Sequence, residues 1–187
     1  MLFLIASLAQ AGCSKGIQQY VRSSANFQYL KKVAVLPFNN MTNDKYAGEK
    51  LKNAVVMEIL VNGVFEVAED GEVNRVVSEV FKEMGFMGGE LVSLDVDAIK
   101  RIAEKLRVNA LFIGTVESYG QEREGGTPYS VVSFSLRLVE ATTGTTIWWA
   151  SYTQEGRSFL KNIFGIKQKN ERALTRDVVK NLLGGLF

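Results

Sequence analysis

The side chain of this sequence best suited to covalent chemistry is its single cysteine, Cys13, at the end of an apolar N-terminal stretch. One cysteine cannot form a disulfide within the chain, so a disulfide-bonded scaffold is excluded. The sequence contains no histidine. Cys13 therefore lacks the usual general base of a catalytic thiol, and a zinc site built from clustered cysteine and histidine is excluded as well. Attachment of a lipid is the remaining use of such a cysteine.

The residues before Cys13 have the apolar character of a secretory signal. Residues 1–12 carry no charge and are too few to span a bilayer. Ala11 and Gly12 resemble the end of the bacterial lipobox, in which small residues precede a cysteine that receives diacylglycerol. Gln10 stands where the lipobox prefers leucine, and no positive charge precedes the stretch. The alternative is an ordinary hydrophobic N-terminus with an incidental cysteine.

The lipobox interpretation divides the 187 residues into three parts. Residues 1–12 are a lipoprotein signal peptide, residues 13–30 a lipidated N-terminus with a polar tether, and residues 31–187 one periplasmic domain. Ser14 after the cysteine, where aspartate would retain a lipoprotein at the inner membrane, implies sorting to the outer membrane of a Gram-negative bacterium. The formal charge of +2 is too small to predict nucleic-acid binding.

No motif in the sequence supports catalysis or cofactor binding. The glycine motifs of phosphate-binding loops and the nucleophile elbow of hydrolases are both missing from the sequence. The carboxylates of Asp95 and Asp97 are typical of a helix N-terminus, and those of Glu122 and Glu124 of a solvated turn. We therefore expect a protein that is not an enzyme, with no catalytic residue, cofactor or metal.

The spacing of the apolar residues predicts a mixed α/β domain. Strands are predicted over residues 31–38, 64–69, 109–120, 130–140 and 146–154, and helices over residues 46–62, 70–84, 95–106 and 171–183, with Asp70 as an N-cap. Glycine-rich polar turns are expected over residues 85–90 and 121–129. This order places a β-α-β unit first and an antiparallel meander last, so we expect one mixed sheet with helices packed on it.

Two aromatic features are candidates for contact with a partner or with the membrane. Trp148 and Trp149 are adjacent in a predicted strand, so they point to opposite faces and one helix layer cannot bury both. One is expected in the core, and the other under a helix or against a partner. A basic stretch then carries five apolar residues, Phe159, Leu160, Ile163, Phe164 and Ile166. Such a mixture suits a membrane-facing or subunit-facing segment, with packing of a short helix on the sheet as the alternative.

Several segments, in order, resemble a family of bacterial envelope lipoproteins. The most specific are residues 33–38 with Asn40 and Thr42, and Thr143-Gly144 followed by Trp148. The family includes the curli secretion channel protein CsgG, the Pel polysaccharide lipoprotein PelC, and domains similar to the N-terminal domain of TolB. The resemblance covers about residues 32–153. It implies an α/β domain in the periplasm, tethered by lipid to the outer membrane, in a family whose members often form rings.

The chain departs from the curli channel in two places. It has no room for two long transmembrane hairpins, and the sequence after Tyr46 lacks the pattern of the loop that narrows the channel. The resemblance therefore implies a homo-oligomeric accessory lipoprotein that works with other secretion or exopolysaccharide-assembly proteins. Two alternatives remain: a monomeric lipoprotein that regulates a periplasmic enzyme such as a peptidoglycan synthase, and a glycan-binding or small-molecule-binding protein that uses the exposed tryptophan.

Overall fold

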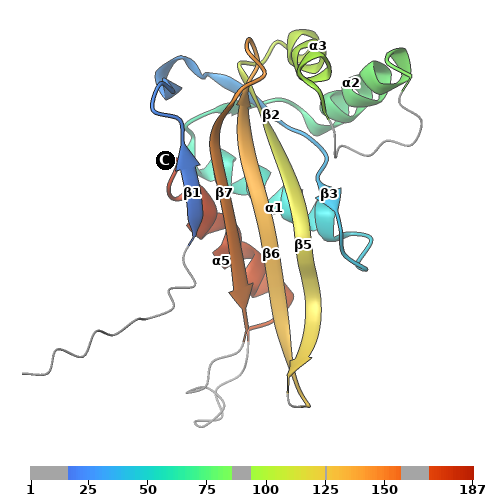
Figure 1. Cartoon of the computed structure of the whole chain (residues 1–187), viewed down its shortest axis with the longest axis vertical. Helices are drawn as coiled ribbons and strands as arrows, with labels where there is room; N and C mark the ends of the chain where they lie inside the picture. Colours follow the sequence, from blue (N-terminus) through green and yellow to red (C-terminus); the bar gives the residue numbers. More distant parts are fainter. Residues whose placement is uncertain (1–16, 86–93, 125, 157–168) are drawn as a thin grey trace, which may run out of the picture.

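The computed structural model describes residues 17–85, 94–124, 126–156 and 169–187, which form one mixed sheet and the helices packed on it (Figure 1). The strands are β1 (Gln18–Val21), β2 (Lys32–Val35), β3 (Asn39–Asn40), β4 (Glu66–Val67), β5 (Ala110–Glu124), β6 (Thr127–Glu140) and β7 (Thr146–Glu155). The helices are the 3-10 turn η1 (Phe27–Tyr29) and the α-helices α1 (Ala47–Asn62), α2 (Asp70–Glu83), α3 (Val96–Leu106) and α5 (Glu171–Leu183).

The strand order in the sheet is β1-β7-β6-β5-β2-β4, and β3 pairs with β5. Strands β2 and β4 are parallel neighbours joined through α1, which is the predicted β-α-β unit. Strand β5 is parallel to β2, and β5, β6 and β7 form an antiparallel meander. The predicted mixed α/β fold with a C-terminal meander is therefore confirmed.

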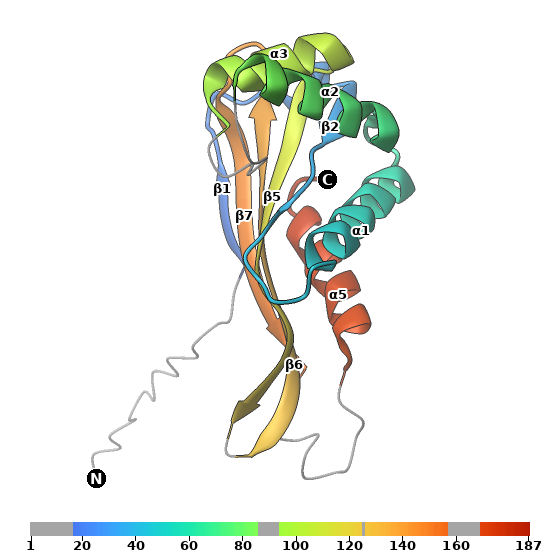
Figure 2. The ribbon, with the colours of Figure 1, turned by 90° about the vertical axis from the view of Figure 1, so that its right-hand side faces the viewer.

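The two faces of the sheet are covered to different extents. Helices α1 and α5 pack on one face, which we call the helix face, and their apolar residues share a core cluster with Phe112, Phe134 and Trp148. Helices α2 and α3 pack on the other face only at the end of the sheet near β2, over residues such as Leu111 and Ile113. Within the described residues, no helix covers the rest of that second face (Figure 2). We call this uncovered part of β5, β6 and β7 the open face.

The ends of three helices follow local signals in the sequence. The side chains of Asp95 and Asn170 each accept a hydrogen bond from a backbone N–H in the first turn of α3 and α5. Helix α1 ends at Gly63, whose φ of 65° lies in the left-handed region that glycine adopts readily.

Asp70 does not cap α2 as predicted. It lies inside the first turn, and its carboxylate pairs with the ammonium group of Lys52, a lysine that is only 5% exposed. A buried lysine needs an opposite charge nearby, and the carboxylate of Asp70 supplies it instead of capping the helix.

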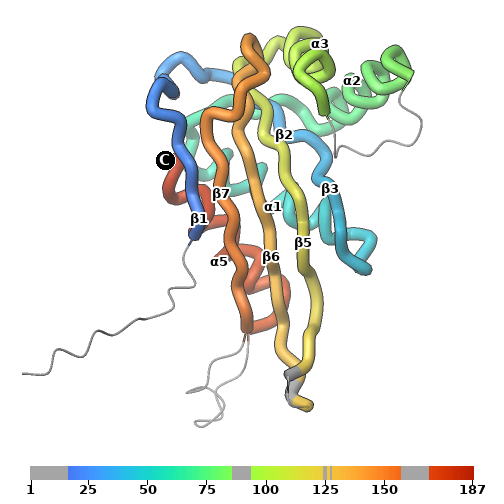
Figure 3. Tube along the Cα trace, viewed as in Figure 1, coloured from blue at the N-terminus to red at the C-terminus, as the bar shows by residue number. Residues whose placement is uncertain are grey.

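Part of the predicted tether belongs to the sheet. Strand β1 lies beside β7 at the sheet edge (Figure 3). The side chain of Gln19 donates a hydrogen bond of 2.9 Å to the carbonyl oxygen of Gly185, which ties the strand to the C-terminus. All four residues of β1 are exposed, so the strand is held by backbone pairing and shows no apolar alternation that would predict it.

The predicted turn over residues 121–129 is also mostly strand. Gln121 pairs with Ser130 and Glu122 with Tyr129, so the β5-β6 hairpin continues to Glu124 and Thr127. In an antiparallel pair the backbone N–H and C=O groups of the two strands bond to each other whatever the side chains are, so a charged sequence is compatible with strand here.

Candidate functional site

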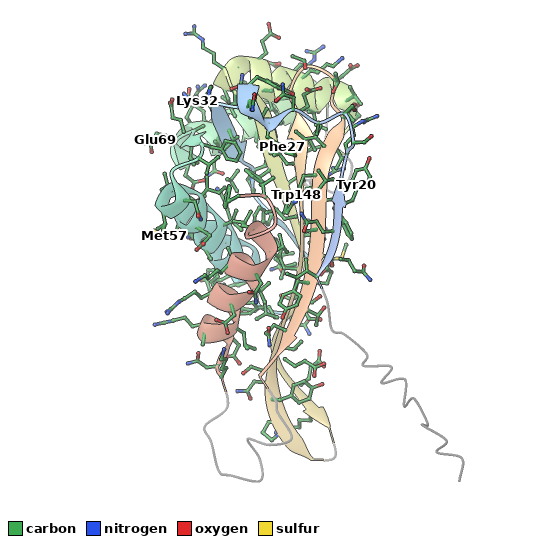
Figure 4. All side chains as sticks on the ribbon, turned by 90° about the vertical axis from the view of Figure 1, so that its left-hand side faces the viewer. Tyr20, Phe27, Lys32, Met57, Glu69 and Trp148 are labelled. Atoms are coloured by element: carbon green, nitrogen blue, oxygen red, sulfur yellow. The ribbon has the colours of Figure 1, made fainter. Side chains whose placement is uncertain are left out.

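The two adjacent tryptophans lie on opposite faces of the sheet, as predicted. Trp148 is fully buried (0% exposed) in the cluster beneath α1 and α5, whereas Trp149 is only partly buried. Figure 4 shows Trp148 directed toward the helices and Tyr20, on β1, directed away from them. Trp148 was also predicted as an interface or membrane contact. This prediction is wrong for the subunit as folded, because its indole has no exposed surface to offer.

Trp149 stands in a row of side chains that crosses the open face. It pairs with Arg137 of β6 on one side and with Tyr20 of β1 on the other. Arg137 in turn pairs with Ile113 of β5, the last residue of this row and one that α2 and α3 bury. Residues directly opposite each other on neighbouring strands share a face. Tyr20, Trp149 and Arg137 therefore form a continuous stripe, which we call the Arg-Trp-Tyr stripe.

A small hollow of about 190 Å³ opens beside this stripe. Its polar lining comes from three strands: Asn39 of β3, Thr115 of β5, and Ser135 and Arg137 of β6. Strand β3 brings Asn39 there by pairing with Thr115. Trp149 and Met41 also line it, together with Ile113, Gly114 and Leu136. The hollow thus combines an aromatic ring, a cation and several hydrogen-bonding groups.

Arg137 is the charged group of the hollow. It is partly buried, and its removal from water lowers the pKa of its guanidinium, which still stays protonated at any physiological pH. No ion pair or hydrogen bond involves its guanidinium within the described part of the chain. Glu117, an acidic residue of β5, accepts hydrogen bonds from Ser133 (3.0 Å) and Ser135 (2.7 Å).

A larger cleft, of about 1050 Å³, lies on the opposite side of the molecule between α1, α5 and β5. Its rim carries an ion pair of 2.6 Å between Asp44 and Lys50. The hydrogen bond from Lys50 holds the pKa of the Asp44 carboxyl below its usual range and raises the pKa of Lys50. The Lys50 ammonium also lies 5.0 Å from the centre of the Tyr119 ring. Both pKa values are shifted away from neutrality, where general acid–base catalysis is most efficient.

Helix α1 carries apolar side chains on its outer side as well as on its packed side. Leu51, Val55 and Ile59 are fully buried against the sheet. Three other apolar residues near its C-terminal end, and Val64 just beyond the helix, are more than half exposed: Met57 (62%), Leu60 (54%), Val61 (74%) and Val64 (51%). We call these four the α1 patch. A helix that is apolar on two sides is typical of one that is buried on both.

The remaining predicted site residues lie outside the described residues. They are Cys13, Phe159, Leu160, Ile163, Phe164 and Ile166. The two residues that flank the last five can be placed: a Cβ added to Gly156 would come within 2.6 Å of the carbonyl oxygen of Lys169. Gly156 and Lys169, the described residues on either side of this range, therefore lie next to each other.

The described residues show neither a metal-ligand cluster nor a membrane-spanning helix. No three histidine, cysteine, aspartate or glutamate side chains gather into a potential metal site in the ranges that the structure describes. Among the described helices, none combines the length and the apolar character needed to cross a membrane.

Comparison with solved structures shows which proteins share this fold. No family model matches the chain, and no curated protein matches its sequence. A PelC dodecamer from Paraburkholderia phytofirmans is 15% identical, with a TM-score of 0.60 over 91% of this chain and 96% of that chain. Lipoprotein GNA1162 from Neisseria meningitidis is 20% identical, with a TM-score of 0.52 over 72% of this chain and 92% of that chain.

A third structure, the hypothetical protein CT253 from Chlamydia trachomatis, is 11% identical, with a TM-score of 0.51 over 84% of this chain and 95% of that chain. At these identities the similarity concerns the fold alone. It supports the PelC part of the resemblance seen in the sequence, while the likeness to CsgG stays a prediction. The chain thus has the same fold as PelC and as a second bacterial lipoprotein, GNA1162.

Proposed function

We propose that this chain is a non-enzymatic, lipid-anchored protein of the bacterial outer membrane that works as a homo-oligomer in secretion or exopolysaccharide assembly. The observation that carries the proposal is the similarity of fold to a PelC dodecamer, which extends over 91% of this chain and 96% of that one. The lipobox-like sequence before Cys13 supplies the anchor, and the domain faces the periplasm.

The α1 patch supports the oligomeric part of the proposal. Its four apolar side chains, three on α1 and Val64 just after it, are each more than half exposed, and burial of apolar surface drives the association of subunits. We propose that this patch is covered by a second copy of the chain. Trp149 and the segment with Phe159 and Phe164 are further candidates for contact with a subunit or with the membrane.

The position of β1 supports a domain held close to the membrane. Strand β1 begins at Gln18, five residues after Cys13. Five extended residues reach at most about 18 Å. A regulator that crosses the periplasm to reach a peptidoglycan synthase needs a longer tether, so the short reach favours a component that acts at the membrane surface.

Oligomeric state and lipidation test the proposal together. The full-length chain is expressed in a Gram-negative host, extracted in mild detergent, and examined by native mass spectrometry. We expect a Cys13 residue that carries acyl groups at a new N-terminus, and a defined multiple of the subunit mass. A non-acylated thiol with residues 1–12 still attached would refute the anchor, and a monomer at all concentrations would refute the assembly.

A pair of matched variants locates the subunit contact. Val61→Glu places a charge in the α1 patch, and Ser78→Glu places the same charge at an exposed position of α2 outside it. We expect Val61→Glu to shift the oligomer toward monomer and Ser78→Glu to leave it unchanged. If both variants keep the same oligomeric state, the subunit contact lies outside the α1 patch.

A further inference from the structure

The Arg-Trp-Tyr stripe has the composition of a binding site, although the proposed function does not require one. Elsewhere the open face carries mainly small polar residues, such as Thr115, Ser133, Ser135 and Ser151. Two aromatic rings and one arginine interrupt this surface in a single row. Packing does not account for them, because no helix covers this row beyond Ile113 among the described residues.

The charge of Arg137 indicates the sign of the ligand. A partly buried cation loses part of its hydration, and the loss is costly unless an anion or hydrogen-bond acceptors replace the water. The guanidinium of Arg137 has neither among the residues that the structure describes. Its planar, forked N–H groups match the two oxygens of a carboxylate, with which they form bidentate hydrogen bonds.

The aromatic residues indicate what carries that carboxylate. Trp149 is partly buried and Tyr20 is 50% exposed, and the two stand side by side on neighbouring strands. The face of an aromatic ring is negative, so it attracts the weakly positive C–H groups that line one face of a pyranose ring. The hydroxyls of Thr115 and Ser135 and the amide of Asn39, in the same hollow, can exchange hydrogen bonds with sugar hydroxyls.

The shape of the site favours one residue of a polymer. The hollow of about 190 Å³ is smaller than the roughly 300–1,000 Å³ that encloses a drug-sized ligand. It adjoins the rest of the open face, on which neighbouring residues of a polymer chain can lie. A peptide carboxylate would bind Arg137 as well. It would not account for the hydroxyl and amide groups of the hollow or for the second aromatic ring.

We propose that the Arg-Trp-Tyr stripe binds an acidic polysaccharide, with the carboxylate of one uronic acid residue on Arg137 and the sugar rings stacked on Trp149 and Tyr20. Glu117 accepts hydrogen bonds from Ser133 and Ser135, and it forms no ion pair with Arg137 among the described residues. The proposal is independent of lipidation and of the α1 patch, and it can fail while the proposed function stands.

The test uses the full-length chain in detergent and isothermal titration with trigalacturonate. The matched ligand is the same trisaccharide with its carboxylates reduced to alcohols. We expect trigalacturonate to bind and the reduced trisaccharide to bind at least tenfold more weakly. Arg137→Gln should lower the affinity for trigalacturonate by about 10- to 100-fold, which corresponds to the loss of a hydrogen-bonded charge pair. The same variant should leave the weak binding of the reduced sugar unchanged.

Three further variants separate the site from general charge attraction and from misfolding. Arg101→Gln removes an exposed arginine of α3 and should not change binding. Trp149→Ala should weaken the binding of both sugars, because either one stacks on the Trp149 ring. Arg137→Lys keeps the positive charge but loses the paired N–H groups of the guanidinium, so it should bind trigalacturonate with intermediate affinity. This variant still tests the proposal if Arg137→Gln does not fold.

Several results would overturn the proposal. They are equal affinity for the acidic and the reduced sugar, an equal loss in Arg101→Gln and Arg137→Gln, no detectable binding of either sugar, or binding of triglutamate as tight as that of trigalacturonate. The last result would assign the stripe to a protein carboxylate.

Discussion

Trp148 and Trp149 are neighbours in β7, yet they belong to two different surfaces. On the helix face, α1 and α5 cover the sheet, and Trp148 is enclosed among core residues such as Phe134 and Leu136. On the open face, the same strands present Ser135, Arg137 and Trp149, all only partly buried. Residues of β6 and β7 on the helix face therefore contribute to the folding free energy through burial, while those on the open face can change at little cost in stability.

This difference explains why the candidate binding groups lie where they do. A side chain in the core is fixed by packing, and even one added methyl group there must be accommodated. A side chain on the open face has no such constraint, so a partly buried arginine without a partner can be kept there. The two faces thus separate the residues that hold the fold from those available for recognition.

The largest expected effect comes from truncating each tryptophan in turn. Trp148→Ala removes a fully buried indole and should lower the free energy of unfolding by roughly 3–5 kcal/mol. Trp149→Ala, one residue later, should lower it by about 1 kcal/mol or less. Urea denaturation at one fixed protein concentration measures both. Equal losses would mean that the open face is covered in the folded protein.

Trp148→Phe is a milder control at the same position. The indole N–H of Trp148 is buried and has no acceptor in the part of the chain that the structure describes. Replacement by phenylalanine therefore breaks no hydrogen bond and removes an unsatisfied donor. We expect a loss well below that of Trp148→Ala, from the smaller ring alone.

A second pair of neighbours, in β5, tests the same difference by adding or removing one small group. A Cβ on Gly114 would come within 2.7 Å of the Phe38 ring and 2.8 Å of the Phe134 ring, whose centres are 5.2 Å apart. Gly114→Ala should therefore cost roughly 1–3 kcal/mol through overpacking. Thr115→Ala, on the open face, should cost less than about 1 kcal/mol.

A double variant identifies the contact responsible. If Phe38 is the obstacle, Phe38→Leu combined with Gly114→Ala should cost less than the sum of the two single changes. Strictly additive losses would show that the added methyl group is accommodated in another way.

The parts of the fold predicted from the sequence are those where one face is buried. Helix α5 occupies the predicted residues 171–183 because Asn170 caps it and its apolar residues repeat at helical spacing. The alternation in β6 predicted one buried and one wet side, and the burial of Phe134 and Leu136 against Ser135 and Arg137 confirms it.

The parts that could not be predicted depend on pairing between distant segments. The four exposed residues of β1 carry no pattern, and only pairing with β7 makes them a strand. The hollow beside Trp149 has the same origin, because Asn39 meets Arg137 only through the pairing of β3 with β5 and of β5 with β6. The sequence predicted Trp149 as a contact residue, but no local signal connects it with Asn39 or Tyr20.

A smaller effect is expected from the polar network of the open face. Glu117 accepts hydrogen bonds from Ser133 and Ser135, and Ser133 also lies 2.8 Å from the hydroxyl of Thr153. Because these groups are exposed to water, Glu117→Gln should cost less than about 1 kcal/mol by urea denaturation. Val116→Ala, the adjacent buried position, is the matched control and should cost more. A larger loss in Glu117→Gln would give the open face a structural role.

The smallest effect concerns the Asp44–Lys50 ion pair at the rim of the cleft, where the cover of the helix face ends. The pKa of Asp44 is lowered in the folded protein, so its contribution is complete above the unfolded pKa of about 3.9 and is lost as the pH falls through the lower folded value. The pKa of Lys50 is raised, so its contribution persists until the pH rises above about 10.4.

The stability difference between the unmodified chain and Asp44→Asn should therefore be constant between about pH 5 and 9 and shrink below about pH 4. Because the pair is partly exposed, the plateau should be at most about 1 kcal/mol and should decrease with added salt. Thermal unfolding of both chains across this range measures it, and a difference that grows as the pH falls would show that the carboxylate of Asp44 does not stabilise the fold through Lys50.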